Sequence, residues 1–121
     1  RCVLLEDRLD MPELYMGMDL CVLPSYREGL PRCLLEAATM GIAVAATDIR
    51  GCREVIVDGE TGLLFPLKDV EGFIAVIERV LADDELRMKL AQAGQLRVRE
   101  RYLESLVTER IVGLYESGIG A

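Results

Sequence analysis

The order of secondary structure can be worked out from two neighbouring stretches, residues 20–24 (LCVLP) and residues 28–36 (EGLPRCLLE). The first is a short apolar run closed by a proline, which is typical of a buried β-strand. In the second, Pro31 suits the first position of a helix, because that position needs no N–H donor and the fixed φ of proline is already helical. Apolar residues then recur on one face until Gly41, which predicts the end of the helix. We therefore predict a strand, a loop and a helix that runs from residue 31 to about residue 40.

The same alternation extends to both sides of this unit. Further strands are expected at residues 2–5, 42–46 and 63–65, and a further helix near residues 11–18. The stretch 42–46 (IAVAA) is almost wholly apolar, as strands buried on both faces are. Alternating strands and helices indicate a parallel sheet with right-handed crossovers. The predicted fold class is thus α/β, a Rossmann-like parallel sheet with flanking helices.

The rest of the chain is predicted to be helical. Apolar residues at three- and four-residue spacing predict helices at residues 70–81, 84–101 and 105–116. The faces expected to pack inward are Val70, Phe73, Ile74, Ile77, Val80 and Leu81 in the first helix, and Leu86, Leu90, Ala93 and Leu96 or Arg97 in the second. We therefore divide the single domain into a sheet core, residues 1–66, and C-terminal helices, residues 67–121.

Two carboxylates lie at the junction of loop and helix. We expect Glu28 in the loop at the carboxyl end of the strand, and Glu36 about a turn and a half into the helix. Eight residues of continuous helix would separate them by roughly 12 Å. This distance is too large for two carboxylates to share one proton. It suits two carboxylates that contact different parts of one elongated ligand.

The ligand groups that such a junction can bind follow from its parts. The helix start at residues 29–31 offers backbone N–H groups and the positive end of the helix dipole, which favour a phosphate. Gly29 allows the backbone to approach a ligand closely. A carboxylate can accept two hydrogen bonds from a vicinal diol, as an acidic residue holds ribose in dinucleotide-binding folds. Together these groups describe a sugar nucleotide; the alternative is that both glutamates are ordinary exposed charges.

Composition and charge narrow the classes of function. The chain has 121 residues, a net charge of −7 and no histidine. An acidic protein is a poor partner for nucleic acid, because phosphate backbones need basic residues. No run reaches the ~18 apolar residues of a membrane span. The four cysteines lack a CxxC spacing, so we expect reduced thiols in a cytoplasmic protein rather than disulfides or a metal site.

The junction and the sequence around it resemble the donor-site motif of family-4 retaining glycosyltransferases of the GT-B fold. The likeness is carried, in the family's order, by residues 24–31 (PSYREGLP), 34–37 (LLEA), 45–48 (AATD), 51–55 (GCREV) and 58–64 (DGETGLL). It implies the C-terminal half of a GT-B donor-binding domain. It also implies a UDP-linked nucleoside diphosphate sugar, whose hexose is transferred with retention to a glycan or lipid-linked acceptor. The family implies neither a metal nor another cofactor.

The resemblance also implies roles for individual residues. Glu36 matches the glutamate that holds the ribose, and Glu28 matches the one that contacts the transferred sugar, which makes Glu28 the catalytic candidate. The backbone after Glu28 would lie beside the sugar and the diphosphate. The donor-binding set is therefore expected to comprise Ser25, Glu28, Gly29, Leu30, Pro31 and Glu36. Residues 51–62, expected as a loop that carries Arg53 and Glu54, would lie near the rim of the pocket. From the residues alone, ordinary turns and a structural role are favoured for this loop.

The resemblance implies that a complete enzyme has parts beyond this chain. Two βα units, a phosphate-binding Arg and Lys, and an acceptor-binding domain would precede residue 1. We therefore expect a partial nucleotide-sugar-binding domain that is inactive by itself. The complete enzyme is expected in the cytoplasm, peripheral to the inner face of the membrane.

Other functions fit parts of the same pattern. A sugar-nucleotide epimerase or a phosphorylase could share the GT-B fold, and a binding module without catalysis could keep it. A glycosidase would place its two carboxylates within roughly 5 to 9.5 Å on opposite sides of one bond. A loop followed by a helix reaches that geometry awkwardly, so the glycosidase is the weakest alternative.

Overall fold

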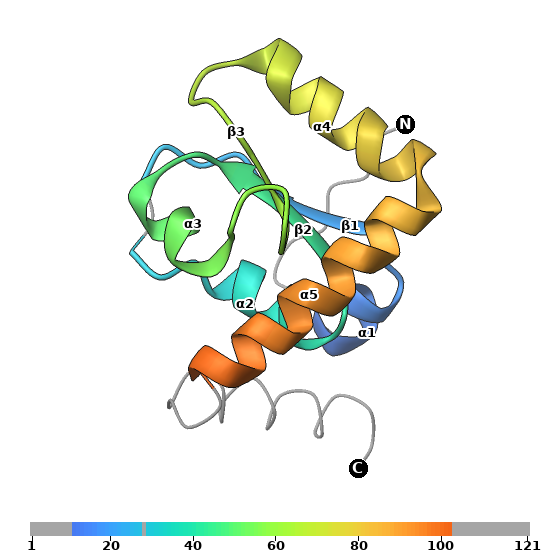
Figure 1. Cartoon of the computed structure of the whole chain (residues 1–121). Coiled ribbons are helices and arrows are strands. Elements are labelled where there is room, and N and C mark those ends of the chain that lie inside the picture. Colours follow the sequence, from blue (N-terminus) through green and yellow to red (C-terminus); the bar gives the residue numbers. More distant parts are fainter. Residues whose placement is uncertain (1–10, 28, 103–121) are drawn as a thin grey trace.

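The structure, a computed structural model, describes residues 11–27 and 29–102. The strand expected at residues 2–5, the helix expected at residues 105–116 and Glu28 lie outside this part of the chain. Figure 1 shows the described residues as a small sheet with helices packed around it. Strands and helices follow one another in the alternating order that the sequence predicts.

Within the described residues, three parallel strands form the sheet in the order β1-β2-β3. They are β1 (Leu20–Leu23), β2 (Ala43–Thr47) and β3 (Leu63–Phe65). Leu20 pairs with Ala43, and Ala45 pairs with Leu63. All five residues of β2 are buried, as expected for a central strand with helices on both faces. The predicted parallel sheet is confirmed, with β2 starting and ending one residue later than predicted.

The helices of the same part of the chain are α1 (Met11–Met16), α2 (Arg32–Thr39), α3 (Arg50–Val55), α4 (Val70–Ala82) and α5 (Asp84–Tyr102). Gly41 ends α2 as predicted, with a left-handed φ of 78° and its N–H donating to the carbonyl oxygen of Ala38 at 3.0 Å. The helix α3 corrects the prediction that residues 51–62 form a loop. It is only six residues long, too short to show an apolar period in the sequence.

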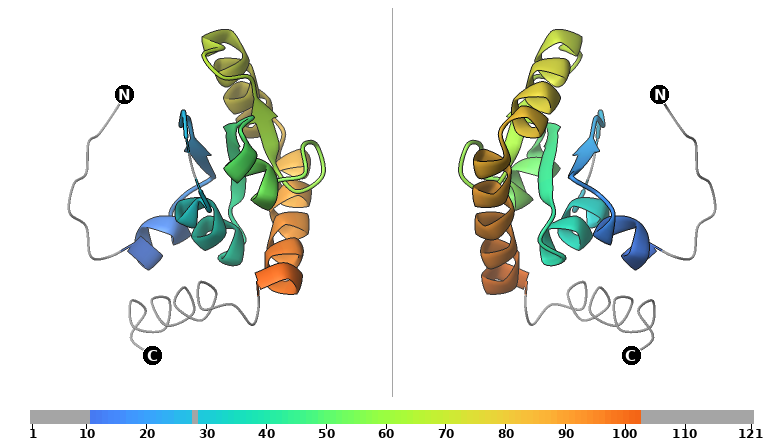
Figure 2. Two further views of the ribbon diagram at one scale, coloured as in Figure 1. Left: turned by 90° about the vertical axis from the view of Figure 1, so that its left-hand side faces the viewer. Right: turned by 90° about the vertical axis from the view of Figure 1, so that its right-hand side faces the viewer.

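The two faces of the sheet have separate hydrophobic cores, because alternate residues of a strand point to opposite faces. On one face, Val44 and Ala46 pack with α1, α2 and α3. On the other face, Ala43 and Ala45 pack with α4 and α5. Figure 2 shows α1 and α2 toward one side of the molecule and α4 and α5 toward the other. The C-terminal part of α5 also reaches the first core through Val98.

The apolar face predicted for α4 is only partly buried. Val80 is fully buried, and Phe73 packs edge-to-face on Phe65 with the ring centroids 5.2 Å apart. In contrast, Val70, Ile74 and Leu81 are 67, 46 and 48% exposed. Within the described residues α4 contacts mainly β3 and α5. The stripe of apolar residues that meets the core is therefore narrower than the sequence predicts.

The inner face of α5 also differs from the prediction. The buried residues are Leu90, Gly94 and Val98, whereas Leu96 is 59% exposed. A Cβ added to Gly94 would lie 2.9 Å from the carbonyl oxygen of Thr61. The helix therefore packs against backbone at this point, a contact that the spacing of apolar residues cannot reveal.

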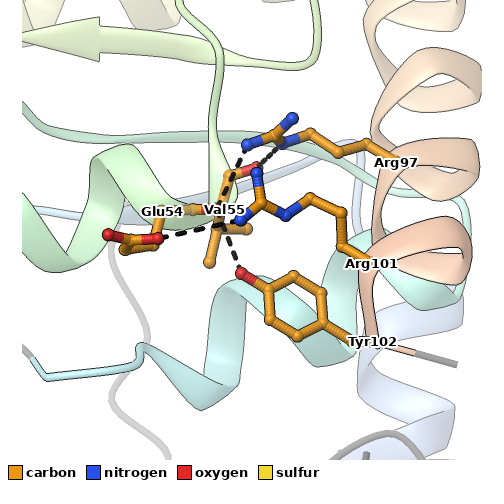
Figure 3. A network of polar contacts seen from close by, with 5 residues as sticks. All are labelled: Glu54, Val55, Arg97, Arg101 and Tyr102. Atoms are coloured by element: carbon orange, nitrogen blue, oxygen red, sulfur yellow. Dashed lines mark hydrogen bonds and ion pairs between the residues drawn. The ribbon is translucent and has the colours of Figure 1, made fainter. Parts of the chain in front are cut away.

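Side chains of α5 also hold the ends of α2 and α3. Nε2 of Gln95 donates to the carbonyl oxygen of Thr39, the last residue of α2, at 3.0 Å. At the end of α3, the guanidinium group of Arg97 donates to the carbonyl oxygens of Val55 at 3.1 Å and Glu54 at 3.3 Å (Figure 3). The last carbonyl groups of a helix have no partner within it. These bonds therefore complete both helices from a distant part of the chain.

Candidate functional site

The candidate site begins in the loop between β1 and α2, at the carboxyl end of the strands. The Ser25 hydroxyl donates to the carbonyl oxygen of Arg27 at 3.2 Å. Gly29 is exposed and Leu30 is 42% exposed. None of the described residues lies within 4 Å of a Cβ added to Gly29. Since no neighbour requires a glycine, its role in the close approach of a ligand stays a prediction, as does the role of Glu28.

The helix α2 begins one residue later than predicted, so Pro31 is the residue before the helix and not its first residue. It is buried and precedes Arg32, the first residue of α2. Its φ of −74° would suit a helix, but its ψ of 101° is extended, so its own backbone is not helical. Its carbonyl oxygen accepts the first helical hydrogen bond, from the N–H of Leu35 at 3.3 Å. Pro31 provides no side-chain acceptor for the first N–H groups of α2.

Glu36 lies in the second turn of α2, as predicted, and is half-buried. Its Oε2 accepts a hydrogen bond of 2.7 Å from the hydroxyl of Tyr15 on α1. Tyr15 is only 3% exposed. Burial and then the hydrogen bond with Glu36 raise the pKa of Tyr15 well above its usual range, so the phenol stays protonated and donates. The sequence gives no sign of this contact, because it joins residues 21 positions apart.

Two cysteines lie beside this pair. A hydrogen bond with the Cys33 thiol, together with burial, raises the pKa of Cys21 above its usual range. Cys21 therefore stays a thiol and is a poor nucleophile. Within the described part of the chain, Cys21, Cys33 and Cys52 form no disulfide. No group of three or more His, Cys, Asp or Glu side chains there could hold a metal ion.

A cavity of about 160 Å³ opens beside the same loop, and the sequence did not predict it. It lies over the ends of β2 and β3 and the start of α4, and its lining includes Ser25 and Tyr26 from the loop, Thr47 from β2, and Lys68. Nζ of Lys68 lies 6.0 Å from the centre of the Tyr26 ring. Glu36 does not line this cavity. The loop thus separates two distinct surfaces, one toward α2 and one toward α4.

The residues expected near the rim of the pocket make other contacts. The carboxylate of Glu54 lies 3.9 Å from the guanidinium group of Arg101, and its carbonyl oxygen accepts a 3.0 Å hydrogen bond from Tyr102 (Figure 3). Nε of Arg53 lies 3.6 Å from Oδ1 of Asp48. Glu54 therefore joins α3 to α5 rather than standing free beside the loop.

Comparison with known proteins identifies the family. Residues 3–97 match the family model described as glycosyl transferases group 1, and the chain therefore belongs to that family.

None of the helices in the described residues has the length and apolar character needed to cross a membrane.

One curated relative is an N,N'-diacetylbacillosaminyl-diphospho-undecaprenol alpha-1,3-N-acetylgalactosaminyltransferase from Campylobacter jejuni. It is 35% identical over 90% of this chain, which covers 29% of the relative. Another is a capsular polysaccharide biosynthesis glycosyltransferase, CapM, from Staphylococcus aureus, 27% identical over 95% of this chain and 30% of the relative. The chain thus spans about 30% of the length of these curated relatives.

Solved structures confirm the predicted fold class. The C-terminal domain of a glycosyl transferase group 1 family protein, LpcC from Francisella tularensis, matches with a TM-score of 0.73 and 32% identity. The match covers 84% of this chain and 52% of that domain. The chain therefore has the Rossmann-like fold of part of the C-terminal domain of a GT-B glycosyltransferase.

Proposed function

We propose that this chain is the donor-binding part of a family-4 retaining glycosyltransferase. The reaction would transfer a hexose from a UDP-linked sugar to a glycan or lipid-linked acceptor, at the cytoplasmic face of the membrane. The observation that carries this proposal is the half-buried carboxylate of Glu36, which lies on α2 shortly after the open loop at the carboxyl end of β1. Membership of the glycosyl transferases group 1 family supports it.

The proposed donor would lie along the start of α2. The carboxylate of Glu36 would accept hydrogen bonds from the ribose diol, since ionised carboxylates make the stronger bonds to hydroxyl groups. The backbone of residues 29–31 and the first turn of the helix would bind the diphosphate. Glu28 would contact the transferred sugar as the catalytic residue, with Ser25 at the beginning of the same loop. In such a reaction the protein mainly positions the donor and stabilises the departing diphosphate.

The names of relatives agree with this donor and acceptor class. The Campylobacter jejuni relative is named for transfer of N-acetylgalactosamine to a diphospho-undecaprenol-linked sugar. A solved structure of Anabaena Alr3699/HepE, which shares this fold with a TM-score of 0.77 at 23% identity, is a complex with UDP.

The site can be tested by nuclear magnetic resonance on the isotope-labelled chain titrated with UDP and with UDP-glucose. We expect binding near 1 mM, which corresponds to about −4 kcal/mol. The resonances of Ser25, Gly29, Leu30 and Glu36 should shift. If only residues that line the 160 Å³ cavity away from the loop, such as Lys68 and Val70, shift, the donor site has been assigned to the wrong side of the loop.

The reaction class needs a second experiment. It uses a longer protein that contains this chain and also the domains that its relatives have in addition. Radiolabelled UDP-sugars are incubated with lipid-linked and glycan acceptors, and the anomeric configuration of the product is determined. A product with the configuration of the donor supports retaining transfer. Conversion of the UDP-sugar into its epimer without an acceptor would instead establish the epimerase alternative, and residues 1–121 alone should form no product.

A further inference from the structure

We propose that Tyr15 is a positioning residue that orients the Glu36 carboxylate for a ribose diol, and so makes the site selective for ribonucleotides. The inference rests on the proposed function, because it assigns Tyr15 a role in donor binding. It begins from the 2.7 Å hydrogen bond between the Tyr15 hydroxyl and Oε2 of Glu36, which joins α1 to α2. Tyr15 would not itself contact the reacting atoms.

The hydroxyl of Tyr15 has no packing function that a phenylalanine could not perform. The side chain is 3% exposed and belongs to the core cluster on the α2 face of the sheet. Burying a hydroxyl is unfavourable unless it is hydrogen-bonded, and here its partner is a carboxylate. The pKa of Tyr15 is raised by burial and by this bond, so the donor is always protonated at neutral pH. The bond therefore has a fixed direction, from the tyrosine to the glutamate.

A fixed carboxylate is a better ligand than a mobile one. A free glutamate side chain samples several rotamers, and this freedom must be lost when it binds a diol. The bond from Tyr15 restricts Glu36 before the ligand arrives. A carboxylate has about four acceptor positions, so one bond from Tyr15 leaves it able to accept hydrogen bonds from the ligand. Since Glu36 is half-buried, it is also accessible from solvent.

The experiment compares Tyr15→Phe with the unchanged chain in titrations with UDP and with its 2′,3′-dideoxy analogue. We expect Tyr15→Phe to weaken UDP binding about three- to tenfold, an effect of the size of one ordinary hydrogen bond, because Tyr15 acts on the ligand only through Glu36. Binding of the dideoxy analogue should be equal in the two proteins, because it has no diol for Glu36. The matched control is Tyr102→Phe, which removes a hydroxyl bonded to Glu54 and should change neither affinity by more than about twofold.

A double-mutant cycle with Glu36→Gln separates the two proposals. In the Glu36→Gln background, Tyr15→Phe should cause no further loss of UDP affinity. If Glu36→Gln weakens UDP but Tyr15→Phe does not, the positioning role is wrong and the donor site stands. If Tyr15→Phe weakens UDP and the dideoxy analogue equally, Tyr15 is merely structural. If UDP does not bind the unchanged chain, or Glu36→Gln has no effect, both proposals fail.

Thermal unfolding of every variant shows whether it is folded. Should Tyr15→Phe unfold, Glu36→Asp tests the same contact from the other partner, because its shorter side chain keeps the charge but draws the carboxylate away from Tyr15. We expect Glu36→Asp to lose the preference for UDP over the dideoxy analogue. A folded Glu36→Asp chain that keeps the full preference contradicts the proposal.

Discussion

The loop between β1 and α2 and the C-terminal half of α5 both border α2, yet they are built in opposite ways. In the loop, Gly29 and Leu30 are exposed, and Ser25 bonds to a residue only two positions away. In α5, Gln95 and Arg97 bond to carbonyl oxygens 56 and 42 positions away in the sequence. One end of α2 therefore adjoins an open surface, while its other end is fixed by distant parts of the chain.

This difference suits the proposed role of α2, which is to present Glu36 to a ligand. Exposed loop groups remain available to a ligand, whereas a site keeps its geometry only when rigid elements support it. We therefore expect substitutions in α5 to change the free energy of unfolding, and substitutions around the loop to change ligand affinity. Four predictions test this separation.

The largest effect is expected in the core beneath α5. Leu90 is 1% exposed, so Leu90→Ala should lower the free energy of unfolding by about 2–5 kcal/mol in chemical denaturation. The matched control is Leu96→Ala, because Leu96 is 59% exposed on the same helix and should cost about 0.5 kcal/mol or less. Equal losses for the two variants would show that α5 packs on a different face.

The next effect concerns ligand affinity rather than stability. Glu36→Ala should weaken UDP binding by about 1–3 kcal/mol, because a ribose diol would lose a charge-assisted partner. Glu28→Ala should leave UDP affinity unchanged but lower turnover in a protein with transferase activity, because its proposed contact is with the sugar. Calorimetric titration with UDP measures the first difference and a transfer assay the second. Equal losses of UDP affinity would refute this division of roles.

A smaller effect is expected where α5 holds α3. Arg97→Ala removes the donors to the carbonyl oxygens of Val55 and Glu54, and we expect a loss of about 1–2 kcal/mol in the free energy of unfolding. UDP affinity should stay within about twofold, because neither carbonyl group belongs to the candidate site. Arg99→Ala, at an exposed position of the same helix, serves as the control in the same denaturation experiment. A change of UDP affinity as large as that of Glu36→Ala would contradict the separation.

The smallest effect is expected for the ion pair between Arg101 and Glu54. Its atoms are 3.9 Å apart and its side chains are 48 and 55% exposed, so water and salt weaken the attraction. Arg101→Gln should lower the free energy of unfolding by about 0.5 kcal/mol or less, with a smaller loss at high salt. Denaturation at low and high ionic strength measures this, and a loss above that of Arg97→Ala would reverse the assigned order of the two contacts.

The parts of the fold that depend on local chemistry were predicted from the sequence. The apolar stretch that forms β2 and the glycine that ends α2 each show their structure within a few residues. The placement of Glu36 on a helix followed from the same local pattern. Pro31 was predicted one position too far into the helix, because its ψ depends on the path of the loop and not on the proline ring.

The contacts that depend on packing could not be predicted. The bond between Tyr15 and Glu36 requires α1 to lie against α2, and neither residue signals the other in the sequence. Gly94 lies on the inner face of α5 because the backbone at Thr61 comes close, whereas an apolar period favours larger residues such as Leu96. The helix α3 was missed because six residues show no period.

The bonds from α5 also bear on the order in which the protein matures during its synthesis. A ribosome makes Thr39 and Val55 well before Gln95 and Arg97, the residues that complete the ends of α2 and α3. Until those donors emerge, the carbonyl groups of Thr39, Glu54 and Val55 can bond only to water or to transient partners. We therefore expect a nascent chain stalled near residue 80 to carry the whole loop sequence and yet lack a stable α2. The segment that would bind the donor is thus translated before the residues of α5 that complete its helix.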